Sequence, residues 1–262
     1  MIGFIGGGNM AAALIKGLIS RGVRDIMVSE PDLTRCALLS NEFKIKTEFN
    51  NKKLASTCGI LILAVKPQII TGILDEVKDS LNDNTIIVSI AAGITLALLK
   101  DRLKKQKIAR VMPNTPALVL EAMSVISFSD MMSKEDQEKV IKLFEAAGKV
   151  LVLPESQMNS VTALSGSGPA FIAYFTEAMI KGGIEQGLDE KSAKILAIQT
   201  LIGTARLLEI TPPDVLIKQV TSPGGTTEAG LKVLRERHAD DIIKETILIA
   251  KKRGDELGKT PK

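Results

Sequence analysis

The sequence predicts an α/β protein in two parts: a doubly wound, mostly parallel sheet over residues 1–154 and an all-helical part over residues 155–262. Three observations predict this class. Short apolar runs alternate with helical patterns through the first part, which is typical of βαβ units. A glycine-rich turn follows the first apolar run. After Pro154 the strand-like runs stop, and long patterns of helical period replace them.

The composition narrows the class of protein and its setting. With 45% hydrophobic and 24% charged residues, the chain is expected to be a soluble globular protein. Only 3% of residues are aromatic and none is Trp, so a surface that stacks on nucleic-acid bases is not expected. No apolar run is long enough to span a membrane, and two cysteines fit a reducing compartment. We therefore expect a cytoplasmic protein without a nucleic-acid or membrane partner.

The titratable residues offer no metal site. Cys36 and Cys58 lack the spacing of metal ligands, and His238 is the single histidine of the chain. His238 ends the charged run that begins at Arg235, and we expect it to be exposed between two helices.

The opening of the chain predicts a nucleotide site. Ile2–Ile5 is a short apolar strand, and Gly6–Ala11 matches the pattern G-x-G-x-x-A, followed by a helix. Strand, glycine turn and helix in this order form the dinucleotide fingerprint of a Rossmann-type fold. Gly6 is expected to make the turn and Gly8 to let the backbone approach a pyrophosphate.

The end of the second strand bears on the choice of cofactor. Ile26–Ser29 is followed by Glu30, which is expected to accept the ribose hydroxyls of NAD and to repel the extra phosphate of NADP, with Asp32 as second candidate. Three basic residues, Arg35, Lys52 and Lys53, are able to counter it. For Arg35 a solvated helix face is the favoured interpretation. Both cofactors stay open, with a lean to NADH.

Alternating strands and helices continue to Pro154. The further predicted strands are Gly59–Val65, Thr85–Ile90, Ile108–Met112, Met123–Ser127 and Val150–Leu153, with a helix over Lys134–Ala147. Ligands of such sheets bind beyond the carboxyl ends of the strands, so segments 64–67, 90–93 and 112–116 should rim the crevice. Lys66 lies in the first of these segments. It either contacts the phosphate or nicotinamide ribose of the cofactor, or is an ordinary exposed lysine.

The second part reads as helices that are apolar on more than one side. They are Ser156–Gly187, interrupted at Ser165–Pro169, then Asp189–Glu209, a helix from Thr226, and Asp240–Leu257. An all-round apolar helix must be buried, so we infer a subunit interface; burial against the sheet domain is the alternative.

A second glycine turn lies at Val220–Leu231, VTSPGGTTEAGL. Pro223 and two glycines permit a tight turn whose N–H groups can form an anion-binding nest. Thr226 or Thr227 is expected to cap the following helix. The nest and the helix N-terminus together suit the binding of a small carboxylate, with a threonine hydroxyl beside it. The alternative is a plain loop followed by a helix cap.

Several blocks, in order, resemble the δ1-pyrroline-5-carboxylate reductase family over nearly the whole chain. They are GFIGGGNM at Gly3–Met10, AVKP at Ala64–Pro67, AAG at Ala91–Gly93, MPNTP at Met112–Pro116, LSGSGPAF at Leu164–Phe171 and TSPGGTTEAGL at Thr221–Leu231. The resemblance implies NADPH- or NADH-dependent reduction of 1-pyrroline-5-carboxylate to L-proline, the last step of proline biosynthesis. It also implies a helical dimerisation domain, a homodimer or higher homo-oligomer, and an active site between the nucleotide domain and the helical dimer.

The resemblance also implies roles for individual residues. Thr227 would lie near the substrate nitrogen as the catalytic residue, and the backbone of Gly224 to Thr226 would hold the substrate carboxylate. The expected substrate contacts are Ser222, Gly224, Gly225, Thr226 and Thr227. Fingerprint, strand ends and resemblance together predict cofactor contacts at Ile5, Gly6, Gly7, Gly8, Asn9, Met10, Ser29, Glu30, Asn51, Ala64, Val65, Lys66, Pro67, Ala91 and Ala92.

Two departures and two rival functions accompany the resemblance. Phe171 replaces a common tyrosine, and Glu30 stands where NADP-using relatives can carry a small hydroxyl residue. A β-hydroxyacid dehydrogenase would need a catalytic lysine in the second part, with Lys181 as the candidate on the long helix and Lys191 and Lys194 on the next. A nucleotide-sensing regulator would bind NAD(P) without turnover, and it has no need for the second anion nest.

Overall fold

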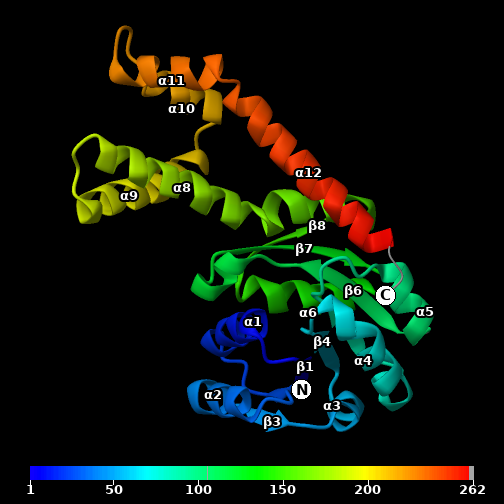
Figure 1. Cartoon of the computed structure of the whole chain (residues 1–262). Helices are drawn as coiled ribbons and strands as arrows, with labels where there is room; N and C mark the ends of the chain where they lie inside the picture. Colours follow the sequence, from blue (N-terminus) through cyan, green and yellow to red (C-terminus); the bar gives the residue numbers. More distant parts are fainter. Residues whose placement is uncertain (105, 260–262) are drawn as a thin grey trace. The chain divides into compact units, whose positions relative to one another are not determined.

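The computed structural model describes residues 1–104 and 106–259, and they divide into two compact units. The first unit holds Met1–Ser167 together with the described residues from Ala250 onward, and the second holds Gly168–Ile249. Figure 1 gives the labels of the helices and strands.

The first unit is built on an eight-stranded sheet, counted over the described residues, in the order β3-β2-β1-β4-β5-β6-β7-β8. Neighbouring strands are parallel except β6 and β7, which are antiparallel. The strands are β1 Ile2–Ile5, β2 Ile26–Ser29, β3 Lys46–Glu48, β4 Ile60–Leu63, β5 Ile86–Ser89, β6 Lys107–Met112, β7 Ala122–Phe128 and β8 Gly148–Val152. The chain reverses its direction of strand addition at β1, which is where ligands of such sheets bind.

Helices cover both faces of this sheet, as a doubly wound fold requires (Figure 1). Phe4 of β1 and Ile62 of β4 belong to a core with helices α1 and α6, whereas their strand neighbours Ile5 and Leu63 belong to a core with α3, α4 and α5. Alternate residues of a strand point to opposite faces, so each strand serves both cores. The helices of this unit are α1 Asn9–Ser20, α2 Leu33–Phe43, α3 Asn51–Thr57, α4 Ile70–Val77, α5 Leu96–Leu103, α6 Lys134–Glu145 and α7 Met158–Val161.

The second unit is entirely helical within its described residues. Its helices are α8 Gly168–Glu185, α9 Glu190–Leu208, α10 Pro213–Gln219, α11 Thr226–Glu236 and the first part of α12 Ala239–Lys259. Helices α8 and α9 pack against each other, with Ala193 and Ala197 buried (Figure 1). Large apolar side chains remain exposed on both helices, among them Tyr174, Phe175 and Ile195.

The elements that were predicted by residue range agree with the structure in type and order. The three-residue strand β3 and the short helix α10 were not predicted, because Lys46–Glu48 carries no apolar alternation and Pro213–Gln219 is about two turns long. The predicted interruption of the long helix is a π-helical turn, Thr162–Gly166, closed by a bond from the Ser167 N–H to the Thr162 carbonyl. None of the described helices is both long and apolar enough to cross a membrane.

The compact units differ from the predicted division at residue 154. Residues 155–167 belong with the sheet, because Met158 and Val161 of α7 pack against Val125 of β7. The described end of α12 belongs there too. The division into residues 1–154 and 155–262 stays a prediction about domains.

A buried ion pair joins α6 to the sheet. Asp136, whose side chain is 8% exposed, binds Lys107 of β6 at 2.8 Å and Lys139 at 3.1 Å. Its backbone N–H also donates to the Ser133 hydroxyl, which caps α6. The hydrogen bond from Lys107, opposed by burial, lowers the pKa of the Asp136 carboxyl from 3.8 to about 2.

We predict that Asp136→Asn lowers the free energy of unfolding at neutral pH by about 2 kcal/mol, the value of a pKa difference of this size. Because the folded pKa of about 2 lies below the ordinary 3.8, the contribution is complete above that ordinary value. It declines as pH falls through the folded value. Urea unfolding from neutral to acid pH measures it, and the variant and the parent should converge in acid. As a control, Glu135→Gln removes only an exposed pair with Lys139 and should change little. Equal losses in the two variants would contradict the prediction.

Candidate functional site

The glycine turn after β1 has the backbone that the fingerprint requires. Gly6 has φ +95°, and a Cβ there would lie 2.6 Å from the Ala64 carbonyl oxygen. Gly8 is the N-cap of α1 without a side-chain cap, and a Cβ there would meet no atom within 4 Å. The N–H groups of the first turn of α1 are therefore open to an anion, and this arrangement fits the pyrophosphate of a dinucleotide.

Glu30, just after β2, turns back to this loop. Its Oε2 accepts the Gly7 N–H at 2.7 Å and its Oε1 accepts the Asp32 N–H at 3.1 Å. The Cys36 thiol donates to the Glu30 carbonyl at 3.2 Å. The carboxylate therefore stands at the glycine turn, where an acid that binds ribose is expected.

The interpretation of Arg35 as a solvated helix residue is wrong. Arg35 lies on α2, is half-buried, and donates from Nε to the Gly7 carbonyl. Its own helix position did not indicate this contact, because the partner lies in the glycine turn of a different βα unit. Glu30 and Arg35 hold the same residue, Gly7, from its N–H and its carbonyl.

Asn51 begins α3 and is hydrogen-bonded to the end of β2. The Ser29 hydroxyl donates to the Asn51 Oδ1 at 2.7 Å, and the Asn51 Nδ2 donates to Glu76 at 2.9 Å. This chain of bonds links β2, the start of α3 and α4.

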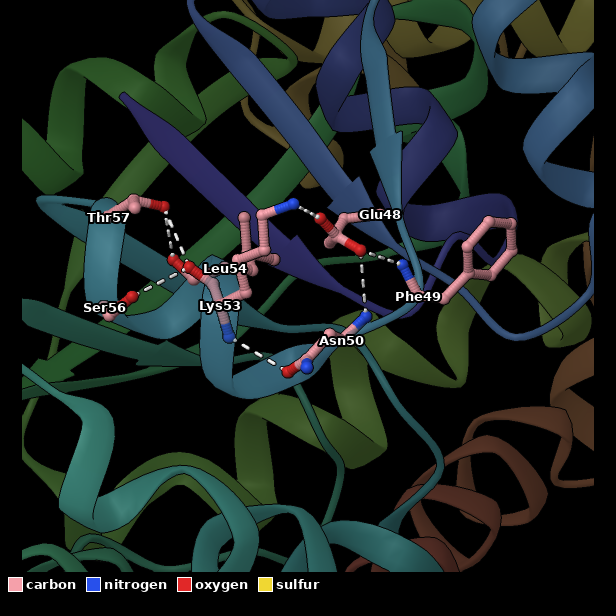
Figure 2. A network of polar contacts seen from close by, with 7 residues as sticks. All are labelled: Glu48, Phe49, Asn50, Lys53, Leu54, Ser56 and Thr57. Atoms are coloured by element: carbon pink, nitrogen blue, oxygen red, sulfur yellow. Dashed lines mark hydrogen bonds and ion pairs between the residues drawn. The ribbon is translucent and has the colours of Figure 1, made fainter.

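The loop before α3 is held by its own polar network, shown in Figure 2. Glu48 pairs with Lys53 at 2.7 Å and accepts the Phe49 N–H at 2.8 Å. The hydrogen bond from Lys53, followed by that from the Phe49 N–H, lowers the pKa of the Glu48 carboxyl. Asn50 caps α3 through the Lys53 N–H. Lys53 therefore forms its ion pair with Glu48, and not with Glu30, the partner that the sequence had left possible.

A cleft of about 370 Å³ opens at the carboxyl ends of β1, β4, β5 and β6. Its lining combines three of the predicted strand-end segments with the glycine turn: Gly8, Asn9, Met10, Ala64, Val65, Lys66, Ile90, Met112, Pro113, Asn114, Thr115 and Gly166. Lys66 lines this cleft from an exposed position. Pro67 and Ala92 line a neighbouring hollow, and Ile5 and Ala91 are buried beneath the surface. The structure thus brings most of the predicted cofactor residues to one edge of the sheet.

Asn114 lies in the predicted rim segment 112–116 but was assigned no role of its own, and Gly166 was not among the predicted site residues. The Asn114 Nδ2 donates to the carbonyl and hydroxyl of Ser165, both at 3.3 Å, and its Oδ1 accepts the Met123 N–H at 2.9 Å. A Cβ on Gly166 would lie 2.6 Å from the Met112 side chain. The MPNTP and LSGSG blocks therefore meet at the cleft, and their recognition as blocks was the signal available in the sequence.

The second glycine turn belongs to the helical unit. Gly224 has φ +71°, and the Gly225 N–H donates to the Ser222 carbonyl at 3.0 Å. The expectation that Thr226 or Thr227 caps α11 is wrong, because Gly225 is the N-cap and both threonines lie inside the first turn. Glycine is one of the residues favoured at the N-cap of a helix. Glu228, in the first turn of α11, instead accepts the N–H of Gly224, the residue before the cap.

Glu228 also shows what the turn can bind. Its Oε2 accepts the Gly224 N–H at 2.7 Å, so a carboxylate already binds a backbone donor of this turn. A neighbouring hollow of about 400 Å³ is lined by Gly224, Gly225, Glu228, Ala229, Lys232, Arg235 and Glu236. Ser222, Thr226 and Thr227 lie in the same turn but do not line this hollow.

The remaining titratable candidates do not form a site. His238 is exposed with φ +52° between α11 and α12, as expected for a linker. Lys181 pairs with Glu177 at 2.7 Å, and this partner raises the pKa of the lysine. Lys181 is an exposed lysine that is paired within its own helix, so the rival that depends on it finds no support here.

Comparison with known proteins finds two family models and several relatives that match the chain over nearly its whole length. A family model described as pyrroline-5-carboxylate reductase dimerisation matches residues 155–257. A model described as NADP oxidoreductase, coenzyme F420-dependent, matches residues 1–93. The pyrroline-5-carboxylate reductase of Synechocystis is 37% identical, over 98% of this chain and 98% of its own length.

Solved structures agree with this comparison. A pyrroline-5-carboxylate reductase from Coxiella burnetii is 34% identical with a TM-score of 0.92, covering 99% of this chain and 98% of its own. A pyrroline carboxylate reductase from Plasmodium falciparum, solved with NADP bound, is 27% identical with a TM-score of 0.89, covering 98% and 97%.

The contrast between Gly6 and Gly8 makes a prediction. Gly8→Ala should leave the free energy of unfolding nearly unchanged and weaken binding of a nicotinamide dinucleotide, because its Cβ would occupy the approach to the pyrophosphate. Gly6→Ala should cost about 1–3 kcal/mol of stability, because alanine is strained at positive φ and meets the Ala64 carbonyl. Thermal unfolding and calorimetric titration with the dinucleotide separate the two effects. Normal dinucleotide binding by a stable Gly8→Ala variant would rule out the close approach.

Proposed function

The chain belongs to the pyrroline-5-carboxylate reductase family, and we propose that it reduces 1-pyrroline-5-carboxylate to L-proline, the last step of proline biosynthesis. It is an NAD(P)H-dependent oxidoreductase that acts on a C=N bond. The main support is the match of full-length relatives together with two intact glycine turns, one with an open helix N-terminus and one whose N–H binds a carboxylate. The hydroxyacid dehydrogenase and the sensor lack such support.

The proposed cofactor contacts follow from the first unit. The glycine turn and the start of α1 would bind the pyrophosphate, and the carboxylate of Glu30 would meet the adenosine ribose. Asn51 with Ser29 and the cleft segment Ala64–Lys66 would complete the contacts. A nicotinamide dinucleotide supplies the hydride when it is bound. The chain has to position that cofactor and exclude water from the cleft.

The proposed substrate contacts lie in the second glycine turn. Backbone N–H groups from Gly224 to Thr226, with Ser222, would hold the substrate carboxylate, in the way that the Gly224 N–H binds the carboxylate of Glu228 in this structure. Thr227 would donate a hydrogen bond to the substrate nitrogen. A protonated imine is already electrophilic, so little further acid catalysis is needed, which suits a chain with a single histidine.

We propose that the chain forms a homodimer or a higher homo-oligomer and acts in the cytoplasm. Exposed apolar side chains on α8 and α9, such as Tyr174 at 77% and Ile195 at 58%, support burial against a second copy. The dimerisation model matches this part of the chain. Cys36 and Cys58 are both free and buried, which suits a reducing compartment.

Initial rates of NADH and NADPH oxidation with pyrroline-5-carboxylate test the proposal directly. We expect oxidation that depends on the substrate, with L-proline as product, measured by absorbance and by chromatography. A purified protein that binds a dinucleotide yet oxidises neither cofactor in the presence of substrate would refute the reductase function.

Thr227→Ala should lower kcat/KM, because the activation free energy should rise by about 1–3 kcal/mol, the size of a lost polar contact. As a matched control, Thr57→Ala removes a hydroxyl that binds carbonyls of its own helix α3 and should leave the rate unchanged. Steady-state kinetics with varied pyrroline-5-carboxylate measure both. An unchanged kcat/KM in Thr227→Ala would remove this residue from the mechanism.

A further inference from the structure

Arg35 is a cation with unused hydrogen-bond donors beside the glycine turn. Only its Nε is engaged, by the Gly7 carbonyl, and its two terminal nitrogens make no hydrogen bond to the described part of the chain. No carboxylate of those residues lies within ion-pair distance of it. A half-buried guanidinium that is held at one nitrogen presents the rest of its planar fork in a defined direction.

Glu30 is held differently. Both of its oxygens accept backbone N–H groups, from Gly7 at 2.7 Å and from Asp32 at 3.1 Å. These two bonds fix the carboxylate and spread part of its negative charge over the turn. Its capacity for the ribose hydroxyls remains, because each carboxylate oxygen can accept more than one hydrogen bond.

The shared anchor places the two groups at one subsite. Glu30 binds the N–H of Gly7 and Arg35 binds its carbonyl, so the carboxylate and the guanidinium lie on neighbouring parts of one turn. An acid at the end of β2 meets the 2′-hydroxyl of the adenosine ribose. A phosphate on that hydroxyl would therefore come within reach of Arg35.

We propose that Arg35 binds the 2′-phosphate of NADPH and offsets the repulsion from Glu30, so that this chain accepts NADPH as well as NADH. The inference rests on the proposed function for its nicotinamide cofactor. Guanidinium and phosphate pair through two parallel hydrogen bonds, which a single lysine ammonium cannot reproduce. Arg35 is thus a residue that determines cofactor specificity.

Arg35→Gln is the main test, because glutamine can still donate to the Gly7 carbonyl while the charge is lost. We expect kcat/KM for NADPH to fall about tenfold to a hundredfold, as for a lost bidentate phosphate contact, mostly through KM. The value for NADH should change little. Arg35→Lys should recover part of the loss, and Glu30→Gln should raise kcat/KM for NADPH.

Lys52→Leu is the control for general electrostatics, since Lys52 is exposed on α3 and carries the same charge. It should leave the ratio of the two cofactors unchanged. Equal losses for NADH and NADPH in Arg35→Gln would overturn the proposal, because they would mean that Arg35 only supports the turn. An unchanged NADPH value would overturn it as well.

Calorimetric titration with 2′,5′-ADP and 5′-AMP separates this inference from the proposed reaction. The wild-type chain should bind both fragments, and Arg35→Gln should weaken binding of 2′,5′-ADP but not of 5′-AMP, whether or not the protein reduces pyrroline-5-carboxylate. Binding of 2′,5′-ADP that survives the substitution unchanged would assign the phosphate to another residue.

Discussion

The close approach of two backbones at Gly6 determines the geometry of the nucleotide end of this protein. The Gly6 N–H donates to the Ser29 carbonyl at 2.8 Å, and the Ala64 N–H donates to the Ile5 carbonyl at 2.8 Å. A side chain at Gly6 would strike the Ala64 carbonyl. The ends of β1, β2 and β4 are therefore locked together, and everything that follows these strands takes its position from this junction.

Both glycine turns use a glutamate to complete their hydrogen bonds. Glu30 accepts the Gly7 N–H and Glu228 accepts the Gly224 N–H, each at 2.7 Å. A tight turn leaves N–H groups that no strand or helix satisfies, and a carboxylate satisfies them well. The two glutamates differ in consequence. In the proposed complex Glu30 would accept a hydrogen bond from a ribose hydroxyl. Glu228 occupies a donor proposed for the substrate carboxylate and would have to release it.

The sequence predicted most of the fold because its signals were local. Apolar runs such as Gly59–Val65 and the fingerprint at Gly6–Ala11 each combine a strand and a turn within a few residues. β3 was missed because its three residues carry no such signal, and it exists because β2 offers an edge to pair with. Likewise the cap of α11 falls on Gly225, since the extended backbone there comes before either threonine.

Arg35 shows where prediction from local pattern ends. Its helix has the polar outer face of an ordinary surface helix, yet the chain returns this residue to a loop formed before α1. Sequence spacing cannot show such a contact, because it arises from the packing of one βα unit beside another. The same packing explains why a carboxylate after β2 is not by itself a sufficient guide to the cofactor. In the proposed cofactor complex, Glu30 and Arg35 together would set the charge at the 2′ position, and only the fold brings Arg35 to the turn.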